Sequence, residues 1–382
     1  MSAAESAPGK GAKFLELWET PLASREKFSS WPFEQQARYL CLLAHLAPST
    51  HNTQPWRFWI RPSERTITLY LDRTYVLPAS DREGRQATIS IGCALEHLLI
   101  GSQYYGLTPV VTLASVDRSA VRPREEADAS RYVEVATVRL LEDTPSEEIP
   151  EEGLVRAIFS RRVTRAEFDP THPLPETLVE KILAGPRGSV ARVHPVTSAV
   201  ARRMLAELQG QADSYVINSP AFRSELAEWM LPNDIESPLG MPGAGFGLND
   251  QEAKRIHEGL RAGSLYPEDG LKFSMAGKRG IESSPFLGLL TAPREGVAEW
   301  LDAGRTLAYA LLLVESAGFQ AAVHAGIAEV PLIRHMFRAF GLEGPLLGTF
   351  RAGRVRDPQH AQRPHSPRQP LDRVLLWEPP QR

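Results

Sequence analysis

Apolar residues recur at helical and strand spacings along most of the chain. A helix from about 32 to 46 is predicted by apolar residues at helical spacing, namely Tyr39, Leu40, Leu43, Ala44 and Leu46. A strongly apolar stretch at 88–105, followed by Gly106, predicts a buried helix that ends at a glycine. Period-two alternation at 56–60 and 66–71 predicts two strands, which we expect to pair as a hairpin.

The rest of the pattern adds strands and helices to both halves of the chain. Strands are predicted at 110–114, 132–138, 191–196, 284–290 and 346–355, the last of them central in its sheet. Helices are predicted at 14–30, 153–159, 175–184 and 199–215, the first of them short and followed by a turn.

Three stretches interrupt this pattern and suggest boundaries. Residues 1–13 predict a disordered tail, and the acidic loop at 142–152 predicts the main boundary, between a first unit at 14–150 and a second at 151–382. The stretch at 219–280 is predicted as a long insertion, because its centre is too rich in glycine and proline for a helix or strand. Long irregular insertions are usually lids or disordered segments, so we expect a lid-like insertion.

The two units share a segment that aligns without gaps. Residues 91–107 match 303–319 at a constant offset of 212 residues, and Gly92 falls on Gly304 while Gly106 falls on Gly318. Two copies of one segment in a chain indicate a duplicated unit. The offset of 212 residues is too long for a solenoid repeat, so the duplication predicts a fused pseudo-dimer.

Composition excludes several classes of protein. The 382 residues suffice for two modest domains or one large one, with 42% hydrophobic and 23% charged residues and a net charge of −3. That charge gives no nucleic-acid or membrane-surface signal, and two cysteines exclude a disulfide framework. No apolar run approaches a membrane span of roughly 18 residues, and Met1 to Lys13 lacks the apolar stretch of a signal peptide, so we expect a cytoplasmic protein.

The first candidate for a functional site is a polar loop at 47–56, between the helix predicted at 32–46 and the strand predicted at 56–60. Pro48 ends the helix, and the polar run after it is expected to keep its side chains free for something other than secondary structure. One interpretation is a helix-to-strand loop capped by serine and asparagine. The other is a ligand-binding loop.

A second candidate is the arginine cluster Arg161, Arg162 and Arg165, just before Phe168. On charge alone the cluster could be a solvated face. Arginines gathered in a bend can also hold a phosphate dianion through several bidentate, charge-assisted bonds.

Both stretches resemble motifs of the flavin-dependent nitroreductase family. The loop is similar to the family's Pro-Ser-x-x-Asn-x-Gln-Pro-Trp signature, and the cluster to its Arg-Arg-Ser-x-Arg motif. Their order along one chain resembles the Acg-type single-chain members, over nearly the whole sequence beyond the tail. The resemblance implies an α+β, nitroreductase-like fold in which two tandem repeats mimic the family homodimer, with mixed or antiparallel sheets flanked by helices.

The resemblance also implies a site for FMN, with NAD(P)H as a possible electron donor. The first repeat would lay a loop against the flavin ring through Pro48, Ser49, Thr50, Asn52 and Gln54. The second repeat would hold the phosphate and ribityl chain through Arg161, Arg162 and Arg165, with Gly326 at the ring and Arg368 near the phosphate.

Departures from the family pattern fall at two positions and in two segments. Val163 stands where the family has a hydroxyl, and Ala325 replaces an acid. The first repeat has no arginine cluster near 25–30, and the second lacks the polar loop near 184–187. We therefore expect one flavin site to survive and its pseudo-symmetric counterpart to be lost.

Three functions remain open from the sequence. The first is an oxidoreductase that passes electrons from NAD(P)H through FMN to a nitro compound, a quinone or a similar small acceptor. The second is a protein that sequesters FMN beneath a lid, with little or no turnover. The third is a cofactor-free interaction protein. In each case the protein would be a monomeric pseudo-dimer or a further homodimer.

No catalytic residue and no metal site are assigned. His51 is the only nearby group that titrates near neutral pH, and it could equally be a loop histidine bonded to the backbone. The ten histidines show no metal-ligand spacing.

Overall fold

The computed structural model describes residues 14–125, 130–142, 149–337, 342–357 and 364–380. The predicted tail at 1–13 and part of the acidic loop at 142–152 lie outside the described residues. Within the described residues, no helix is both long and apolar enough to cross a lipid bilayer.

A first sheet of five strands has the order β11-β1-β2-β4-β3. It comprises β1 (Trp56–Arg61), β2 (Thr66–Asp72), β3 (Thr108–Leu113), β4 (Tyr132–Leu141) and β11 (Leu375–Leu376). The predicted hairpin is confirmed, because Trp56 pairs with Leu71 and Arg61 with Thr66 in antiparallel register. Only β11 runs parallel to its neighbour, β1.

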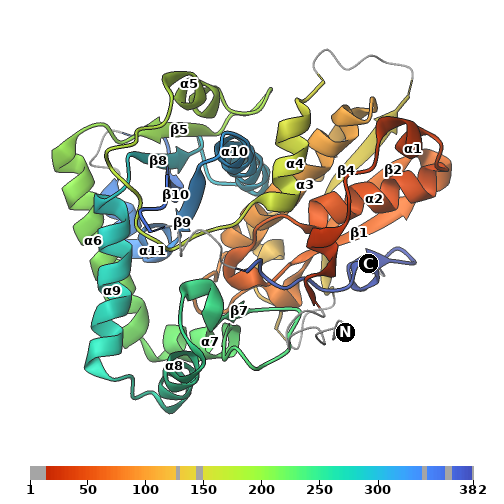
Figure 1. Cartoon of the computed structure of the whole chain (residues 1–382). Helices are drawn as coiled ribbons and strands as arrows, with labels where there is room; N and C mark the ends of the chain where they lie inside the picture. Colours follow the sequence, from red (N-terminus) through yellow and green to blue (C-terminus); the bar gives the residue numbers. More distant parts are fainter. Residues whose placement is uncertain (1–13, 126–129, 143–148, 338–341, 358–363, 381–382) are drawn as a thin grey trace, which may run out of the picture.

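Helices α1 (Arg25–Ser29), α2 (Phe33–His45), α3 (Arg85–Tyr104) and α4 (Glu152–Ser160) accompany the first sheet (Figure 1). Helix α2 follows Pro32 and buries an apolar face that includes Leu40 and Leu43, as predicted. Both Cys41 and Cys93 are buried free thiols.

A second sheet of four antiparallel strands has the order β5-β8-β10-β9. Its strands are β5 (Arg192–Pro195), β8 (Phe286–Thr291), β9 (Gln320–His324) and β10 (Leu346–Gly353). The predicted central position of the last strand is confirmed, because β10 pairs with both β8 and β9. Helices α5 (Glu176–Ala184), α10 (Val297–Ser316), α11 (Gly326–Glu329) and α12 (Pro331–Met336) accompany this sheet. Two sheets flanked by helices make an α+β fold.

Helices α3 and α10 cross in the middle of the molecule (Figure 1). A Cβ atom placed on Gly92 would lie 2.0 Å from the carbonyl oxygen of Leu301, and one placed on Gly304 would lie 2.0 Å from that of Ile89. The two glycines that match at the 212-residue offset thus face each other where the backbones come closest. This reciprocity is what a pseudo-two-fold axis would produce.

The insertion at 219–280, called the lid from here on, is mostly helical. Helix α6 (Ala199–Asn218) leads into α7 (Pro220–Trp229), and α8 (Asp250–Ala262) and α9 (Pro267–Glu282) follow. The prediction of an irregular insertion was therefore wrong for most of its length. A capping box between Asn249 and Glu252 opens α8, and a proline in the first turn opens α9. Only the centre is irregular, with a two-residue pairing of β6 (Met230–Leu231) and β7 (Met241–Pro242).

The segment from 364 to 376 returns from the second sheet to the first. Its strand β11 pairs Leu375 with Phe58, and the ring of His365 stacks on Trp18 at 4.2 Å. The first sheet therefore contains strands from both sides of the proposed unit boundary.

Candidate functional site

One cavity of about 760 Å³ lies where the two halves and the lid meet. Nine of the ten residues predicted for the cofactor line it, namely Pro48, Ser49, Thr50, Asn52, Arg161, Arg162, Arg165, Gly326 and Arg368. The tenth, Gln54, is fully buried beside it. The structure thus brings the two sequence motifs together around a single space.

The polar loop holds an unusual backbone conformation. His51, Asn52 and Gln54 have φ values of 49°, 57° and 51°, in the left-handed region that residues other than glycine rarely adopt. Ser49 Oγ accepts a hydrogen bond from the Gln54 N–H at 3.0 Å, and the Thr50 hydroxyl donates to Gln86 Oε1 at 2.9 Å. Strain that surrounding bonds hold in place is typical of functional loops.

The side-chain amides of this loop bind the lid and the C-terminal segment. Asn52 Nδ2 donates to the carbonyl oxygens of Gly240 at 3.0 Å and Pro367 at 2.9 Å. Gln54 Nε2 donates to the carbonyl of Pro238 at 2.8 Å. The lid therefore rests directly on the loop that was predicted to contact the flavin ring.

The guanidinium of Arg368 is also engaged in hydrogen bonds within the protein. Its guanidinium donates to the carbonyls of His45, Leu46 and Ala47 at the end of α2, and to Asn52 Oδ1 at 2.7 Å. A cation at a helix C-terminus is favourable because it meets the negative end of the helix dipole. The proximity of Arg368 to a phosphate remains a prediction, while its contacts here fix the loop.

Buried polar atoms that lack a hydrogen-bond partner gather around the cavity. Within the described residues they include Arg161 Nε, Arg162 Nε, His51 Nδ1, His365 Nδ1 and Arg351 Nη1, all from residues that line it. A buried unpaired donor costs about 1–3 kcal/mol, so the arginine nitrogens among these atoms are natural partners of an acceptor-rich ligand. The acceptors Gln209 Oε1 and Asp269 Oδ2, also from residues that line the cavity, lack a partner as well.

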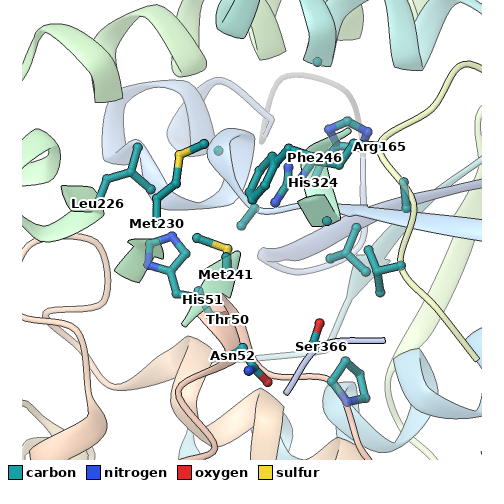
Figure 2. A pocket seen from close by; sticks show the side chains of 18 of the residues that line it. Thr50, His51, Asn52, Arg165, Leu226, Met230, Met241, Phe246, His324 and Ser366 are labelled. Atoms are coloured by element: carbon teal, nitrogen blue, oxygen red, sulfur yellow. The ribbon is translucent and has the colours of Figure 1, made fainter. Parts of the chain in front are cut away.

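The three arginines, which the resemblance assigned together to the phosphate and ribityl chain, divide between two ends of the cavity. Arg161 donates to the carbonyl of Leu46 at 3.0 Å. Burial lowers the pKa of His365 to about 3, and the charges of Arg162 and Arg161 add to this effect. Arg165 lies at the other end, where its guanidinium covers the ring of Phe246 from the lid at 4.5 Å (Figure 2). The two ends are called the tail end and the lid end below.

Both histidines at the lid end are neutral. Burial and the charge of Arg165 lower the pKa of His51 to about 4. The pKa of His324 also falls well below its usual value, because burial acts together with the charges of Arg351 and Arg165. Both imidazole rings are therefore in the neutral form at neutral pH.

The lid is also latched at a point that the sequence motifs do not contain. Glu225 of α7 is buried and accepts hydrogen bonds from the backbone N–H groups of Ala79 and Ser80, at 2.7 and 3.1 Å, and from the Ser80 hydroxyl. Leu226, Met230, Met241 and Phe246 line the same cavity as Thr50 and His51, and Met230 and Met241 lie beside His51 (Figure 2). The sequence signal that could have identified Glu225 is a glutamate on the otherwise apolar face of a helix.

Asp213 is a further cavity residue that sequence reasoning missed. It lies on the face of α6 that also carries Leu205, Gln209 and Ala212, and burial raises its pKa to about 7. Among the described residues there is no group of three or more histidine, cysteine, aspartate or glutamate side chains that could hold a metal ion.

Comparison with known proteins gives relatives over most of the chain. No family model matches. The chain is 28% identical over 340 residues to an uncharacterized protein of Mycobacterium tuberculosis strain H37Rv, and the match covers 87% of this chain and 91% of the relative. It is 34% identical over 132 residues to a protein of the same strain with the provisional name NAD(P)H nitroreductase acg, over 32% of this chain and 39% of that one.

One solved structure, the FMN-dependent nitroreductase NfnB of Mycobacterium smegmatis in complex with NADPH, matches 60% of this chain and 99% of its own. Its sequence identity is 19% and its TM-score is 0.39.

Proposed function

Since this chain is a relative of the Acg-like proteins of the nitroreductase family, we propose that it is an FMN-dependent oxidoreductase. It passes electrons from NAD(P)H to a small electron-poor acceptor such as a nitro compound or a quinone. The observation that carries the proposal is the convergence of the polar loop and the arginine cluster on one cavity.

The residues around the cavity suit FMN. The unpaired Nε atoms of Arg161 and Arg162 are donors that phosphate oxygens can accept from, at the tail end of the cavity. The volume of about 760 Å³ lies in the range of roughly 300–1,000 Å³ that small-molecule sites have. Bound FMN would supply the transfer of a hydride or of single electrons.

The residues of the chain would bind FMN, orient it and shield it from water. Arg161 and Arg162 would hold the phosphate, and the loop at 48–54 would form one wall of the ring site. The lid, seated on Asn52 and Gln54, would exclude water. Arg165 would offer a positive charge to the ring end, where reduction builds up negative charge.

The proposal extends to the architecture. Two tandem repeats would form a pseudo-dimer with one surviving flavin site, in line with the reciprocal contact of Gly92 and Gly304. The expected stoichiometry is one FMN per chain.

The test is to purify the protein, release its flavin by denaturation and measure absorbance against protein concentration. One FMN per chain, bleached by NADPH without oxygen and restored by a quinone, is the expected result. A protein that neither carries nor takes up FMN would refute the proposal.

A second candidate is an FMN-sequestering protein with little or no turnover. It is favoured by the lid, which bonds to the loop amides and is latched by Glu225. Bound FMN that stays oxidised with excess NADPH, yet is bleached by dithionite, would select this function over the first.

A further inference from the structure

Arg351 places a buried guanidinium at the lid end of the cavity. It belongs to β10, lines the cavity and is only 1% exposed. Its Nε donates a hydrogen bond to His324 Nε2 at 2.8 Å, whereas its Nη1 has no partner within the described residues. Because buried donors are normally satisfied, the unpaired Nη1 indicates that a ligand supplies the missing acceptor.

The charge of this guanidinium has no counter-ion among the described residues. Glu167 is the acid whose charge acts on Arg351, but it forms ion pairs with Arg279 and Arg356. The guanidinium carbon lies 4.5 Å from the centroid of the Phe168 ring, and an aromatic face attracts a cation without neutralising it. Burial lowers the pKa of Arg351 to about 9, so the side chain stays charged at neutral pH. A buried charge without a counter-ion is costly, and an anionic ligand would supply one.

A glycine leaves room for the guanidinium on the side of α9. A Cβ atom placed on Gly280 would fall 2.9 Å from Arg351 Nη2 and 3.0 Å from its Nε. Helix α9 therefore covers the Nη2 and Nε side of the group, and His324 takes the hydrogen bond from Nε. Nη1 is left as the nitrogen for a ligand in the cavity.

His324 adds a second donor next to Arg351. Because its Nε2 accepts from Arg351 and the ring is neutral, the ring proton lies on Nδ1. This Nδ1 donates to no residue that the structure describes, and the ring lines the cavity (Figure 2). A guanidinium N–H and an imidazole N–H are both donors that a carboxylate accepts from.

The charge selects the chemical class of the ligand. The phosphate of FMN is assigned to Arg161 and Arg162 at the tail end, so an anion at Arg351 belongs to a second molecule. A carboxylate carries the single negative charge that one guanidinium neutralises, and its planar shape suits that group. A nitro group or a quinone carbonyl alone is neutral and would leave the buried charge without a counter-ion.

The position of the pair suits an acceptor that reacts with the flavin. His324 comes two residues before Gly326, the residue expected at the flavin ring, and both line the cavity. A molecule held by His324 and Arg351 would therefore lie near that ring.

We propose that Arg351 and His324 form a carboxylate subsite, and that the acceptor is an electron-poor aromatic compound that carries a carboxylate. The inference rests on the proposed function, because it names the acceptor of the same flavin site. The carboxylate accepts from Arg351 Nη1 and His324 Nδ1 and becomes the counter-ion of the guanidinium. A neutral acceptor of the same shape leaves that charge without a counter-ion and binds more weakly.

The test compares two nitroaromatic probes that differ in charge. The first, para-nitrobenzoate, carries a carboxylate, and para-nitrobenzamide replaces it with a neutral amide of similar size. Calorimetry measures the affinity of each probe for the purified protein, and assays with NADPH measure kcat/KM. We expect the wild type to bind para-nitrobenzoate at least roughly tenfold more tightly than para-nitrobenzamide, with a similar ratio in kcat/KM.

Arg351→Gln removes the charge and keeps a polar side chain. It should bind the two probes with equal affinity, by losing affinity for para-nitrobenzoate alone, and it should keep its FMN. Arg354→Gln is the matched control, since Arg354 lies just after the same strand, is exposed and does not line the cavity. This control should keep the wild-type preference.

Equal affinity of the wild type for the two probes would overturn the inference, and so would a preference that Arg351→Gln retains. In either case, FMN that NADPH reduces in the same sample leaves the proposed function standing. If the protein holds no FMN, the proposed function fails and the ligand is not an acceptor, while calorimetry still decides whether the carboxylate subsite exists. If Arg351→Gln does not fold, the wild-type comparison decides alone.

Discussion

At the residue scale, some polar atoms around the cavity lack a hydrogen-bond partner among the described residues, while other side chains use their donors in hydrogen bonds within the protein. Arg161 and Arg162 each keep a buried Nε without a hydrogen-bond partner among the described residues. Arg368, Asn52 and Gln54, by contrast, use their donors to join α2, the loop, the lid and the C-terminal segment. A ligand therefore meets a site whose shape is already fixed and whose arginine donors are available at the tail end.

Arg165 provides the first prediction at this scale. Arg165→Ala removes a cation from the lid end of the cavity and its stacking on Phe246. We expect FMN to bind at least about tenfold more weakly, since bonds to charged groups contribute about 1.5–3 kcal/mol. The measurement is a fluorescence titration of the apoprotein with FMN.

Arg203→Ala is the control for this titration, because it removes the same charge from an exposed position on α6. It should leave FMN affinity unchanged. Equal affinity of Arg165→Ala and the wild type would exclude Arg165 from the flavin site.

The sequence predicted the cavity residues well where the signal was local. The residues from Pro48 to Gln54 and from Arg161 to Arg165 form short runs of unusual composition, so both were found. Asp213 and Glu225 are single acids within amphipathic helices, and their importance depends on partners far along the chain. The bonds of Asn52 and Gln54 to the lid have the same long-range origin, and so the sequence did not predict them.

At the scale of elements, the lid is an ordered helical unit that packs on α6 through α9 and is joined to the first half of the chain by polar contacts. The latch joins Glu225 of α7 to residues 79–80, and the loop amides hold Pro238 and Gly240. The polar contacts to the first half are the ones that must break for α7 and residues 238–240 to move away from the polar loop while the sheets stay folded.

The latch gives a prediction for this element. Glu225→Ala removes the acceptor of three hydrogen bonds, and buried N–H groups at 79–80 are left without it. We expect the rate of amide hydrogen exchange in α7 and in residues 79–80 to increase at least tenfold. This corresponds to a decrease of about 1.5 kcal/mol or more in the free energy of local opening. Bound FMN should also exchange faster.

Glu228→Ala on the same helix tests whether any loss of a glutamate has this effect. Its side chain is exposed, so exchange should stay as in the wild type. If the two variants exchange alike, Glu225 is not the latch.

The failure to predict the lid helices has a physical reason as well. The glycines and prolines of residues 238–247 dominate the composition of the insertion, while α8 and α9 on its far side carry ordinary helix signals. An average over the whole insertion hides those signals. The capping box at Asn249 was present in the sequence and marked the true start of a helix.

At the scale of the whole molecule, the two halves are joined at the crossing of α3 and α10. The sequence predicted the pairing of β1 with β2, because alternation and hairpin spacing are local properties. For the second sheet it predicted the central position of β10 but not the pairings of its strands. The attachment of β11 to β1 was not predicted, since a two-residue strand more than 300 residues from its partner leaves no pattern.

The helix crossing provides the last prediction. Gly92→Ala would place a methyl group 2.0 Å from the carbonyl oxygen of Leu301, in backbone that cannot easily move. We expect the free energy of unfolding to fall by about 1–3 kcal/mol or more, as for other overpacked interiors. Urea denaturation followed by circular dichroism measures the change.

Gly153→Ala serves as the reference substitution. It lies in the first turn of α4, and a Cβ there meets no atom within 4 Å. It should be neutral or raise stability by up to about 1 kcal/mol. A Gly92→Ala protein as stable as this one would mean that α3 and α10 are not closely apposed at this position.

The return of residues 364–376 to the first sheet has a consequence for the order in which the protein matures. A ribosome delivers the polar loop early, yet the partners that fix it, Pro367 and Arg368, emerge more than 300 residues later. The first sheet can collapse during synthesis, but the polar loop lacks these hydrogen-bond partners until residue 368 has been made. Under the proposed function, a shorter nascent chain would not hold FMN, and cofactor binding would follow the synthesis of this segment.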